Sequence, residues 1–424
     1  MASGPLSGIR VLEFTQIIAG PFCCQHLADM GAEVMKFEPL EGEPWRLMAE
    51  LVPKESRTYA SLNRGKKSIA LDMNRSESRD AIHRMAKDAD VVVINYRPGV
   101  AEKLGIDYKT LSAINSRLVY CENTAFGRQG PLAKRGGYDI VVQGLTGLMA
   151  GEAKMDGAVP TYIYPAIADY ATGIQMSNAI CAALFHRERT GEGQRIDCTL
   201  MGTALAMQTT QFTWIDAWDE AVLPPMLEAI TAARQEQKSF LEQLEIHNTY
   251  RPAATGNIYY RVYQTSDGFL ILGALSHALR LKVLLATALK DTRFRPDGGF
   301  DLNPPGWAED GPKLVAEAEA LFLSKSTSEW LRVLEAAGVP SGPMHFVEEL
   351  FDHPQTLENG LVVELDHPIL GHMRMVGPPF QMSKSPLAPQ GPSPVLGADT
   401  DEILASAGLT RDEVDAMRRS GAVL

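Results

Sequence analysis

The chain has 424 residues, of which 45% are hydrophobic, and its formal net charge is −12. This length exceeds that of a usual single domain, so we expect two domains with ordinary hydrophobic cores. The acidic balance argues against nucleic acid or an anionic membrane surface as a partner, because both bind basic patches. An anionic ligand is therefore expected to be held by a few well-placed cations.

The N-terminal region lacks the basic start and apolar stretch of a signal peptide. The longest apolar helix candidate, around residues 174–185, is interrupted by polar side chains and falls short of the roughly 20 residues that a membrane span needs. Five cysteines, with Cys23 and Cys24 adjacent, favour reduced thiols over a disulfide framework. We therefore expect a soluble, cytoplasmic protein with no membrane partner.

Strands and helices alternate through the N-terminal half. An apolar strand at 10–14 precedes a helix that Gly20-Pro21 opens and Gly31 closes, and a second strand follows at 33–38. Such a βαβ unit implies parallel strands. The same alternation predicts strands at 68–73, 91–96, 118–123 and 194–199, and helices at 77–89, through Leu104, through Ile114 and from Asp169 to about Arg189. The pattern predicts an α/β fold with a doubly wound, largely parallel, Rossmann-like sheet.

The composition changes after Pro224-Pro225. A long helix of mixed charge at 226–247 suits an exposed or subunit-facing connector. Further elements are a hairpin at 258–264 and 269–273, a helix at 278–289, a Pro/Gly-rich loop at 295–312, a helix from the capping box at Ser326 to Gly338, and returning strands at 339–380. The loop is either a cover or a surface excursion. We therefore expect a large α/β domain at 1–224 and 340–424, with a connector helix and a smaller α+β domain at 225–339.

Familiar cofactor motifs are missing from the sequence. It contains no G-x-G-x-x-G after the first strand, no P-loop, no H-E-x-x-H and no G-x-S-x-G. Its nine histidines are scattered without metal-ligand spacing. We therefore expect no metal site and no permanently bound cofactor.

Asp169 lies between an apolar run at 161–168 and a helix of small residues. An aspartate at such a junction is most simply a helix N-cap. A carboxylate can also attack an activated acyl group and divide an exchange into covalent steps. With an ordinary pKa of about 3.9, aspartate is ionised and ready to attack at neutral pH.

The wider sequence distinguishes the helix N-cap from the nucleophile as the role of Asp169, because many short motifs occur in a characteristic order. They are 6–14, 19–22, 27–34, 36–39, 63–68, 71–73, 95–99, 168–173, 189–194, 338–343 and 376–380. Together they resemble the class III CoA-transferases, the family of carnitine and bile-acid CoA enzymes related to formyl-CoA transferase and α-methylacyl-CoA racemase. The resemblance covers nearly the whole chain.

The resemblance implies a covalent mechanism on Asp169. The aspartate attacks an acyl-CoA thioester to form an anhydride, CoA then forms an aspartyl-CoA thioester, and an incoming acid takes the CoA. We expect N–H groups of the helix that follows Asp169 to stabilise the oxyanions. The resemblance also implies an interlocked homodimer, in which the helix at 226–247 crosses between domains. Coenzyme A and acyl-CoA enter as substrates, together with a small carboxylic acid.

Several residues are expected to bind these substrates. Loops before and after strands place Arg64, Lys66, Lys67 and Arg97 where a sheet of this class binds anionic ligands. The family likeness implies CoA phosphates near Lys66 and Lys67, and the adenine and 3′-phosphate end near Asn95, Tyr96, Arg97 and Lys103. Gln16, Ile18 and Ala19 are expected in the substrate pocket.

Two departures from related enzymes bear on the reaction. Tyr138 stands where the racemases have histidine, and tyrosine, with an ordinary pKa of about 10, is a poor base for moving an α-proton. Tyr138 therefore favours CoA transfer, with its hydroxyl either donating to the thioester or packing beside it. Ile18 replaces the glutamine of formyl-CoA transferases, so we expect other acids, such as succinyl-CoA with a small dicarboxylate or hydroxydicarboxylate. A racemase or isomerase and a non-catalytic acyl-CoA-binding protein remain the alternatives.

Overall fold

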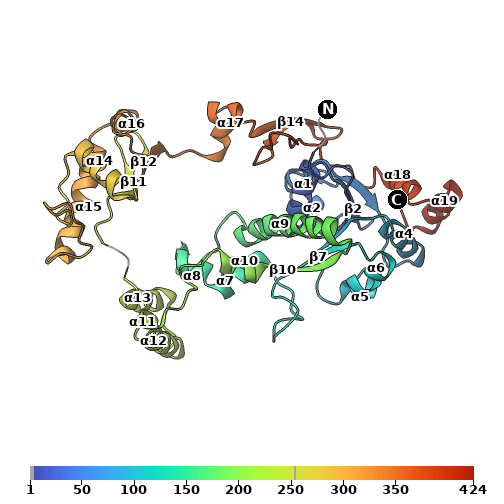
Figure 1. Cartoon of the computed structure of the whole chain (residues 1–424), viewed down its shortest axis with the longest axis horizontal. Coiled ribbons are helices and arrows are strands. Elements are labelled where there is room, and N and C mark those ends of the chain that lie inside the picture. The colour runs from blue at the N-terminus through green and yellow to red at the C-terminus, as the bar shows by residue number, and fades with distance from the viewer. Residues whose placement is uncertain (1–3, 253–254) are drawn as a thin grey trace. The chain divides into compact units, whose positions relative to one another are not determined.

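The computed structural model describes residues 4–252 and 255–424. The chain divides into two compact units. The first unit comprises Met1–Asp219 and Pro354–Leu424, and the second comprises Glu220–His353. Figure 1 shows the chain coloured from its N-terminus to its C-terminus.

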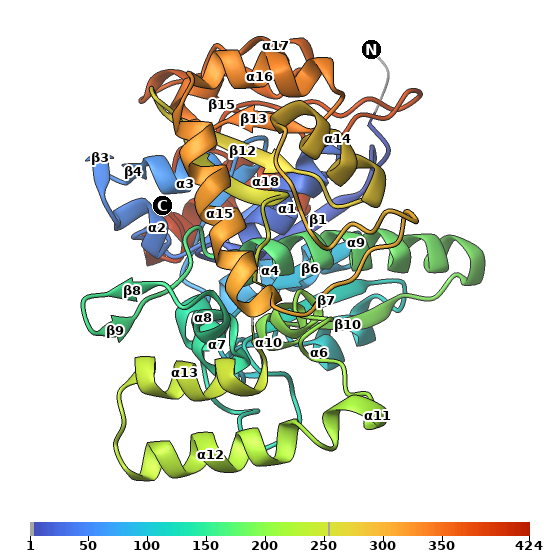
Figure 2. The ribbon, with the colours of Figure 1, turned by 90° about the vertical axis from the view of Figure 1, so that its left-hand side faces the viewer.

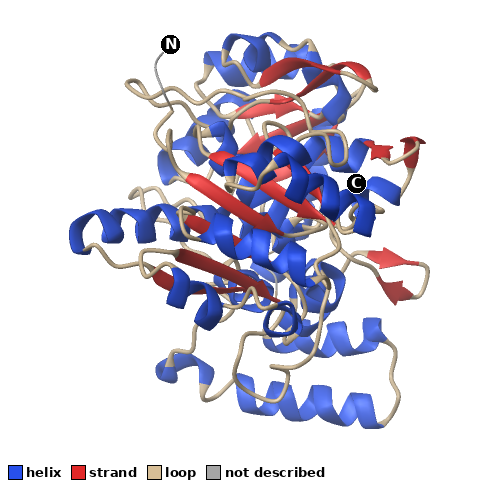
Figure 3. Cartoon of the chain, turned by 90° about the vertical axis from the view of Figure 1, so that its right-hand side faces the viewer, coloured by secondary structure: helices blue, strands red, loops and turns tan. Residues whose placement is uncertain are grey.

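A six-stranded parallel sheet organises the first unit, and its strands are the central red arrows of Figure 3. The strands are β1 (Arg10–Phe14), β2 (Glu33–Glu38), β5 (Lys67–Ala70), β6 (Val91–Ile94), β7 (Val119–Thr124) and β10 (Gln194–Thr199). Their spatial order is β10-β7-β6-β1-β2-β5, and every neighbouring pair is parallel. The chain therefore winds outward from β1 in both directions, which confirms the predicted parallel α/β sheet. The order reverses between β1 and β6, where sheets of this kind bind ligands.

Alternating side chains of the strands build a core on each face of the sheet. Leu12 and Phe14 pack on one face, together with side chains from the helices α4 (Ser76–Ala86), α6 (Tyr108–Ile114), α18 (Thr400–Ser406) and α19 (Arg411–Ser420). Val11 packs on the other face with α1 (Ala19–Asp29) and α9 (Ile167–Thr190). Because successive strand residues point to opposite faces, both faces of this sheet are covered.

Helices α1 and α9 lie side by side in the first unit (Figures 1 and 2). Gly173 of α9 makes this approach possible, because a Cβ there would lie 2.8 Å from the carbonyl oxygen of Ala19. Helix α9 begins at Ile167, two residues before the predicted start at Asp169. This difference fixes the position of Asp169 within the first turn.

The first unit contains further short elements. The helices are α2 (Pro44–Leu47), α3 (Arg57–Leu62), α5 (Val100–Leu104), α7 (Asp139–Thr146), α8 (Leu148–Glu152), α10 (Leu200–Ala206), α11 (Asp216–Asp219) and α17 (Pro354–Glu358). The antiparallel pairs are β3 (Glu50–Val52) with β4 (Glu55–Ser56), β8 (Met155–Asp156) with β9 (Val159–Pro160), and β14 (Val362–His367) with β15 (Gly371–Val376). The predicted strands at 339–380 therefore form only in part, since turns and short helices separate them.

The second unit contains a helical hairpin where the sequence predicted one long helix. Helix α12 (Leu223–Gln235) ends before Gln237, whose φ of 57° lies in the left-handed region. Ser239 and Glu242 then form a capping box that starts α13 (Phe240–Tyr250). The prediction of a continuous helix at 226–247 is wrong, because a cap and a left-handed residue interrupt it.

A three-stranded antiparallel sheet forms the rest of the second unit. It pairs β11 (Tyr260–Gln264), β12 (Phe269–Gly273) and β13 (Ser341–Pro343), which confirms the predicted hairpin. The accompanying helices are α14 (His277–Thr287), α15 (Trp307–Leu323), α16 (Thr327–Ala336) and the 3-10 helix Val347–Phe351. Tyr263, Phe322 and Trp330 are buried in its core. Helix α15 begins within the segment predicted as a loop at 295–312.

Candidate active site

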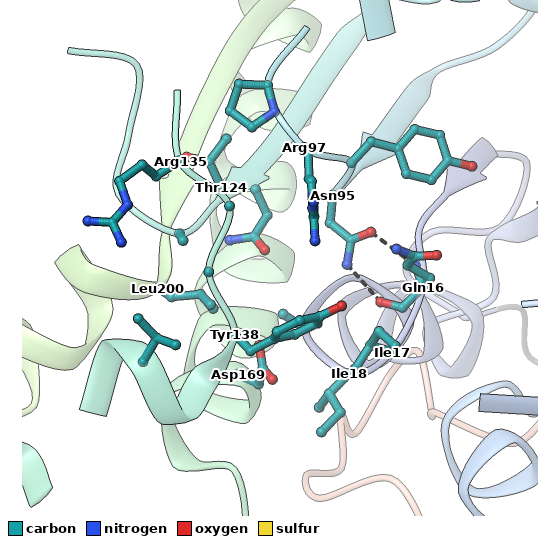
Figure 4. A pocket seen from close by; sticks show the side chains of 18 residues that line it. Gln16, Ile17, Ile18, Asn95, Arg97, Thr124, Arg135, Tyr138, Asp169 and Leu200 are labelled. Carbon is teal, nitrogen blue, oxygen red and sulfur yellow. Dashed lines mark hydrogen bonds between the residues drawn. The ribbon is translucent and has the colours of Figure 1, made fainter. Parts of the chain in front are cut away.

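A cavity of about 270 Å³ lies at the carboxyl ends of β1, β6 and β7 (Figure 4). The residues that follow β1 and β6 form two of its walls, so it lies at the point where the strand order reverses. Its lining residues are Gln16, Ile17, Ile18, Ala19, Asn95, Tyr96, Arg97, Pro98, Asn123, Thr124, Ala125, Arg135, Gly136, Gly137, Tyr138, Val141, Asp169 and Leu200. All of them belong to the first unit. The cavity is therefore the candidate active site.

Asp169 lines this cavity as the third residue of α9 and is only 9% exposed. It is not the N-cap of the helix, because that position is occupied by Ala166, which has no capping side chain. The cap is supplied by Asp139, whose Oδ1 accepts the backbone N–H groups of Ala168 at 2.8 Å and of Asp169 at 3.1 Å. The Asp169 carboxylate is thus not engaged in capping its own helix.

This arrangement changes the expected source of oxyanion donors. The N–H groups of Ala168 and Asp169 already donate to Asp139, and the N–H of Tyr170 donates to the carbonyl of Ala166 at 3.0 Å. The expectation that the start of α9 offers free donors is therefore wrong. Helix α1, in contrast, begins at Ala19 in the same cavity, and no side chain of residues 4–252 or 255–424 caps its N-terminus. The partial positive charge of this helix end faces the site.

The environment of Asp169 makes it an unusual carboxyl group. Burial and the negative charge of Asp139 raise the pKa of Asp169 to about 7. Burial disfavours the charged form because it removes water, and a neighbouring anion does so by repulsion. The sequence-based expectation of an ordinary, fully ionised aspartate is therefore corrected, since this group exchanges its proton near neutral pH.

Two glycines bring Tyr138 to the cavity. A Cβ at Gly136 would lie 3.1 Å from Nε of Arg97, and one at Gly137 would lie 2.8 Å from Cβ of Ala125. The backbone can pass this close to both neighbours because glycine has no side chain. Tyr138, which follows, is 57% exposed, and its side chain points into the cavity in Figure 4.

A constrained turn after β1 forms the opposite wall. The Asn95 side chain accepts the Gln16 N–H at 3.0 Å and donates to the Gln16 carbonyl at 2.8 Å. The next residue, Ile17, has a φ of 73°, which is rare for a β-branched residue, and its N–H donates to buried Glu43 at 2.8 Å. Lys36 forms an ion pair with Glu43 at 3.1 Å. Buried polar groups thus hold a strained turn facing Asp169.

Most of the residues expected in the site meet in this cavity. The structure brings together Asp169, Tyr138, Gln16, Ile18, Ala19, Asn95, Tyr96 and Arg97. Arg97 has no carboxylate partner among residues 4–252 and 255–424, and neither does Arg135, which the sequence analysis missed. The cavity therefore combines one buried carboxyl group with two arginines free to meet an anion.

Four expected cations lie elsewhere. Arg64 is buried, and its guanidinium pairs with Asp29 at 2.6 and 3.0 Å. Lys66 is also buried and contacts Glu13 at 2.9 Å. The positive charges of Arg64 and Lys66 are therefore already neutralised inside the protein, where a phosphate cannot approach. Neither residue can serve as a CoA contact.

The other two cations remain at the surface. Lys67 pairs with Glu33 at 2.8 Å and with Glu402 at 2.7 Å. Lys103 is exposed on α5. Neither residue lines the cavity that contains Asp169.

A second cavity, of about 510 Å³, shares Gln16 and Tyr96 with the first. Its wall includes the apolar side chains of Phe37, Leu71 and Met73. Val100 and Leu104 of α5 also line it, and Lys103 lies between them in sequence. The two cavities thus adjoin along the carboxyl edge of the sheet and can accommodate an elongated ligand.

Sequence reasoning missed Asp139, Arg135 and Glu43. Asp139 directly follows Tyr138 in the sequence, so a candidate position was close at hand, but its capping partners lie about 30 residues away. Within residues 4–252 and 255–424, no group of three or more histidine, cysteine, aspartate or glutamate side chains could hold a metal ion. No helix of the same residues is long and apolar enough to cross a membrane.

Comparison with known proteins agrees with this site. The family model for CoA-transferase family III matches residues 6–400. The chain is 32% identical over 406 residues to succinyl-CoA:glutarate CoA-transferase of Mus musculus. This alignment covers 94% of this chain and 86% of the relative. It is 33% identical over 422 residues to succinate--glutarate CoA-transferase of Agrobacterium fabrum, with 95% of each covered.

Solved structures give the same result. The chain resembles the orthorhombic crystal structure of Rv3272 from M. tuberculosis with a TM-score of 0.74 and 27% identity, covering 95% of this chain and 99% of that one. These matches define an α/β enzyme that transfers CoA. The chain belongs to CoA-transferase family III.

Proposed function

We propose that this enzyme moves CoA from succinyl-CoA to a small dicarboxylic acid through covalent intermediates on Asp169. The observation that carries the proposal is the buried Asp169 carboxyl group in a cavity at the strand-order reversal of a family III chain. The succinyl-CoA:glutarate relatives support the choice of acids. Tyr138 in place of histidine supports transfer over racemisation.

The proposed reaction exchanges acyl groups without a net proton. A carboxylate oxygen of Asp169 attacks the succinyl-CoA carbonyl, the C–S bond breaks, and CoA thiolate leaves a succinyl-aspartyl anhydride. The thiolate then attacks Cγ of Asp169, which expels succinate and forms an aspartyl-CoA thioester. The acceptor carboxylate attacks that thioester and releases the thiolate again. Attack of the thiolate on the acceptor's acyl carbon forms the new acyl-CoA and restores the Asp169 carboxylate.

Each attack in this sequence places negative charge on a carbonyl oxygen. We assign its stabilisation to the uncapped N-terminus of α1 at Ile18 and Ala19, which lines the cavity with Asp169. Backbone donors held in place before the reaction stabilise developing charge without having to reorganise. The constrained turn at Ile17 keeps that helix start in position.

The second cavity is the proposed site for the nucleotide end of CoA. Its apolar wall of Phe37, Leu71 and Met73 suits the faces of an adenine ring, and it opens next to Tyr96. Lys103 on α5, which lies between the lining residues Val100 and Leu104 in sequence, is the cation proposed for phosphate contacts. Lys67 is not, because it begins β5 at the opposite, amino edge of the sheet and pairs with Glu33 and Glu402. The pantetheine arm would then extend past Gln16 toward Asp169.

Arg97 is reassigned from the phosphate end to the acid substrate. It lines the Asp169 cavity and has no carboxylate partner in the described part of the chain. A guanidinium binds a carboxylate through paired hydrogen bonds, so it suits the distal carboxylate of a dicarboxylic acid. Arg135 in the same lining adds positive charge.

The homodimer is also a proposal. Large apolar side chains of the first unit are exposed in the single chain, including Phe185, Phe212, Trp214 and Trp218. An exposed apolar surface of this kind is typical of a subunit interface. Size-exclusion chromatography with light scattering tests this proposal, because a monomer at micromolar concentration would contradict it.

A screen of acyl-CoA donors against carboxylic acids, read by mass spectrometry, tests the reaction. We expect succinyl-CoA and dicarboxylates to give the fastest exchange, and rapid quenching to capture a CoA adduct on the Asp169 peptide. Asp169→Ala should abolish both, whereas Asp107→Asn, which alters the cap of α6 outside the lining of both cavities, should retain them. Normal turnover by Asp169→Ala would refute the nucleophile. Deuterium entering the α-carbon without any acceptor acid would instead indicate a racemase.

A further inference from the structure

Asp139 is held between two sets of hydrogen-bond donors. Its Oδ1 accepts the N–H groups of Ala168 and Asp169 at 2.8 and 3.1 Å. Its other oxygen, Oδ2, accepts a hydrogen bond from Nε2 of Gln143. Asp139 and Gln143 are both buried, so these protein groups, rather than water, determine what Asp139 can accept or donate.

The orientation of Gln143 is fixed by the backbone of Ile163. Its Oε1 accepts the Ile163 N–H at 2.8 Å, and its Nε2 donates to the Ile163 carbonyl at 3.0 Å. The amide therefore cannot turn over without losing both bonds. As a result, Gln143 presents a donor, and never an acceptor, to Asp139.

Three hydrogen-bond donors converge on the Asp139 carboxylate: two backbone N–H groups on Oδ1 and the Gln143 amide on Oδ2. A proton on Oδ1 would break one of the two backbone bonds that cap α9. When two carboxyl groups share a buried site, repulsion leaves one of them holding a proton. The hydrogen bonds point to Asp169 as that group, since three donors hold Asp139, whereas no side-chain hydrogen bond of Asp169 is seen within residues 4–252 and 255–424.

We propose that Asp139 is a positioning residue for CoA transfer: its fixed negative charge caps α9 and makes Asp169 both the stronger nucleophile and the one member of the pair that takes up a proton. This inference rests on the proposed function of Asp169. A carboxylate that holds its proton more tightly also has a more reactive lone pair toward an acyl carbon. Asp139 itself makes no contact with the substrate.

The electrostatics around Asp169 agree with this assignment. Burial and Asp139 together raise the pKa of Asp169 to about 7. Other charged or titratable groups near it are Arg97, Arg135 and Tyr138 of the cavity, Tyr170 of its own helix, and His26 of α1, which contacts Phe22 beside Tyr170. Among all these groups, Asp139 is the anion that opposes ionisation of Asp169.

The pH dependence of adduct formation tests the proposal in a way that a merely structural role would not mimic. Single-turnover formation of the Asp169 adduct is measured from pH 5 to pH 9 for the wild type, Asp139→Asn and the matched cap variant Asp107→Asn. In the wild type we expect half-maximal rate near pH 7. In Asp139→Asn the midpoint should fall by about one unit, so the ratio of rates at pH 6 and pH 8 rises about fivefold. An unchanged ratio in a folded Asp139→Asn variant would overturn the proposal.

Two further measurements cover the remaining outcomes. If Asp139→Asn does not fold, the wild type can still overturn the proposal, because an acid limb below pH 5 contradicts a raised pKa of Asp169. A limb near pH 7 supports the raised pKa, to which burial contributes more than Asp139. Urea midpoints at pH 8 for Asp139→Asn, Asp169→Asn and the double variant need no substrate. Non-additive effects support the pair, and additive effects overturn it. If the effects on the urea midpoints are non-additive but the enzyme transfers CoA from none of the donors tested, the charge pair is supported and the proposed function is refuted.

Discussion

Replacing Asp169 by asparagine should stabilise the protein at alkaline pH. The side chain is 9% exposed, and its pKa rises from an ordinary value of 3.8 to about 7 on folding. One pKa unit corresponds to about 1.4 kcal/mol, so the ionised carboxylate costs the folded state at most about 4 kcal/mol. Asparagine is nearly the same shape and carries no charge, so the variant avoids that cost.

The sign of the effect depends on pH. Below the unfolded value of 3.8 the carboxyl group is protonated in both states, and its stabilising contribution relative to the ionised form is fully present. As pH rises toward about 7, the unfolded chain ionises first, so folding becomes progressively less favourable. The cost is about 1.5 kcal/mol at pH 5 and about 4 kcal/mol at pH 8. The stabilisation by Asp169→Asn should therefore grow by about 2.5 kcal/mol over this interval.

Urea unfolding at pH 5 and pH 8, followed by circular dichroism, measures this difference. Each variant is compared with the wild type at the same pH, so shared effects of pH on the rest of the chain cancel. Asp107→Asn serves as the control, since Asp107 caps α6, accepts the N–H of Thr110 and does not line either cavity. Equal effects of Asp169→Asn at both pH values would refute the reasoning, because a group with an ordinary pKa produces no such growth.

Three further substitutions test other parts of the site. Arg97→Ala should raise the KM for the acceptor dicarboxylate about tenfold or more, with Arg97→Lys intermediate, and steady-state kinetics at fixed succinyl-CoA would show this. Tyr138→Phe should keep the fold but lower kcat about tenfold if the hydroxyl donates to the thioester; an unchanged kcat would assign Tyr138 to packing alone. Gly173→Ala should lower stability by about 1–3 kcal/mol in thermal unfolding, because its Cβ would meet the Ala19 carbonyl at 2.8 Å.

The sequence predicted the sheet well because its strands carry strong local signals. Val91–Ile94 is an uninterrupted β-branched run. The start of α1 was predicted to within one residue, since the helix begins at Ala19 and Pro21 is its third residue rather than its first. The interruption of the predicted helix at 226–247 also had a signal, the S-x-x-E spacing of Ser239 and Glu242, but the continuous pattern of charges concealed it. Local patterns were therefore sufficient wherever one segment determined the element.

The site was predicted less completely because its properties depend on residues distant in sequence. Lys66 was expected to lie near CoA phosphates, but the fold places Glu13, 53 residues earlier, against it. The pKa of Asp169 likewise depends on Asp139, which lies 30 residues earlier. The sequence thus identified the nucleophile candidate and much of its cavity but not the partners that tune it. Those partners follow from the crossing of α7 and α9, which no local pattern encodes.

The cavity combines two features that each oppose stability, and both face the same space. On one side Asp169 is a buried carboxyl group beside a second anion, and on the other Ile17 adopts a left-handed backbone conformation. A buried acidic residue that accepts backbone N–H groups holds each of these features. Asp139 caps the first turn of α9, which contains Asp169, and Glu43 accepts the Ile17 N–H. Burying such acids rarely improves stability in itself. Their placement is better explained by the geometry they impose, so neutralising Asp169 should make the protein more stable and less active. Removing Glu43 should lower stability as well as activity, because buried Lys36 would lose one of its carboxylate partners.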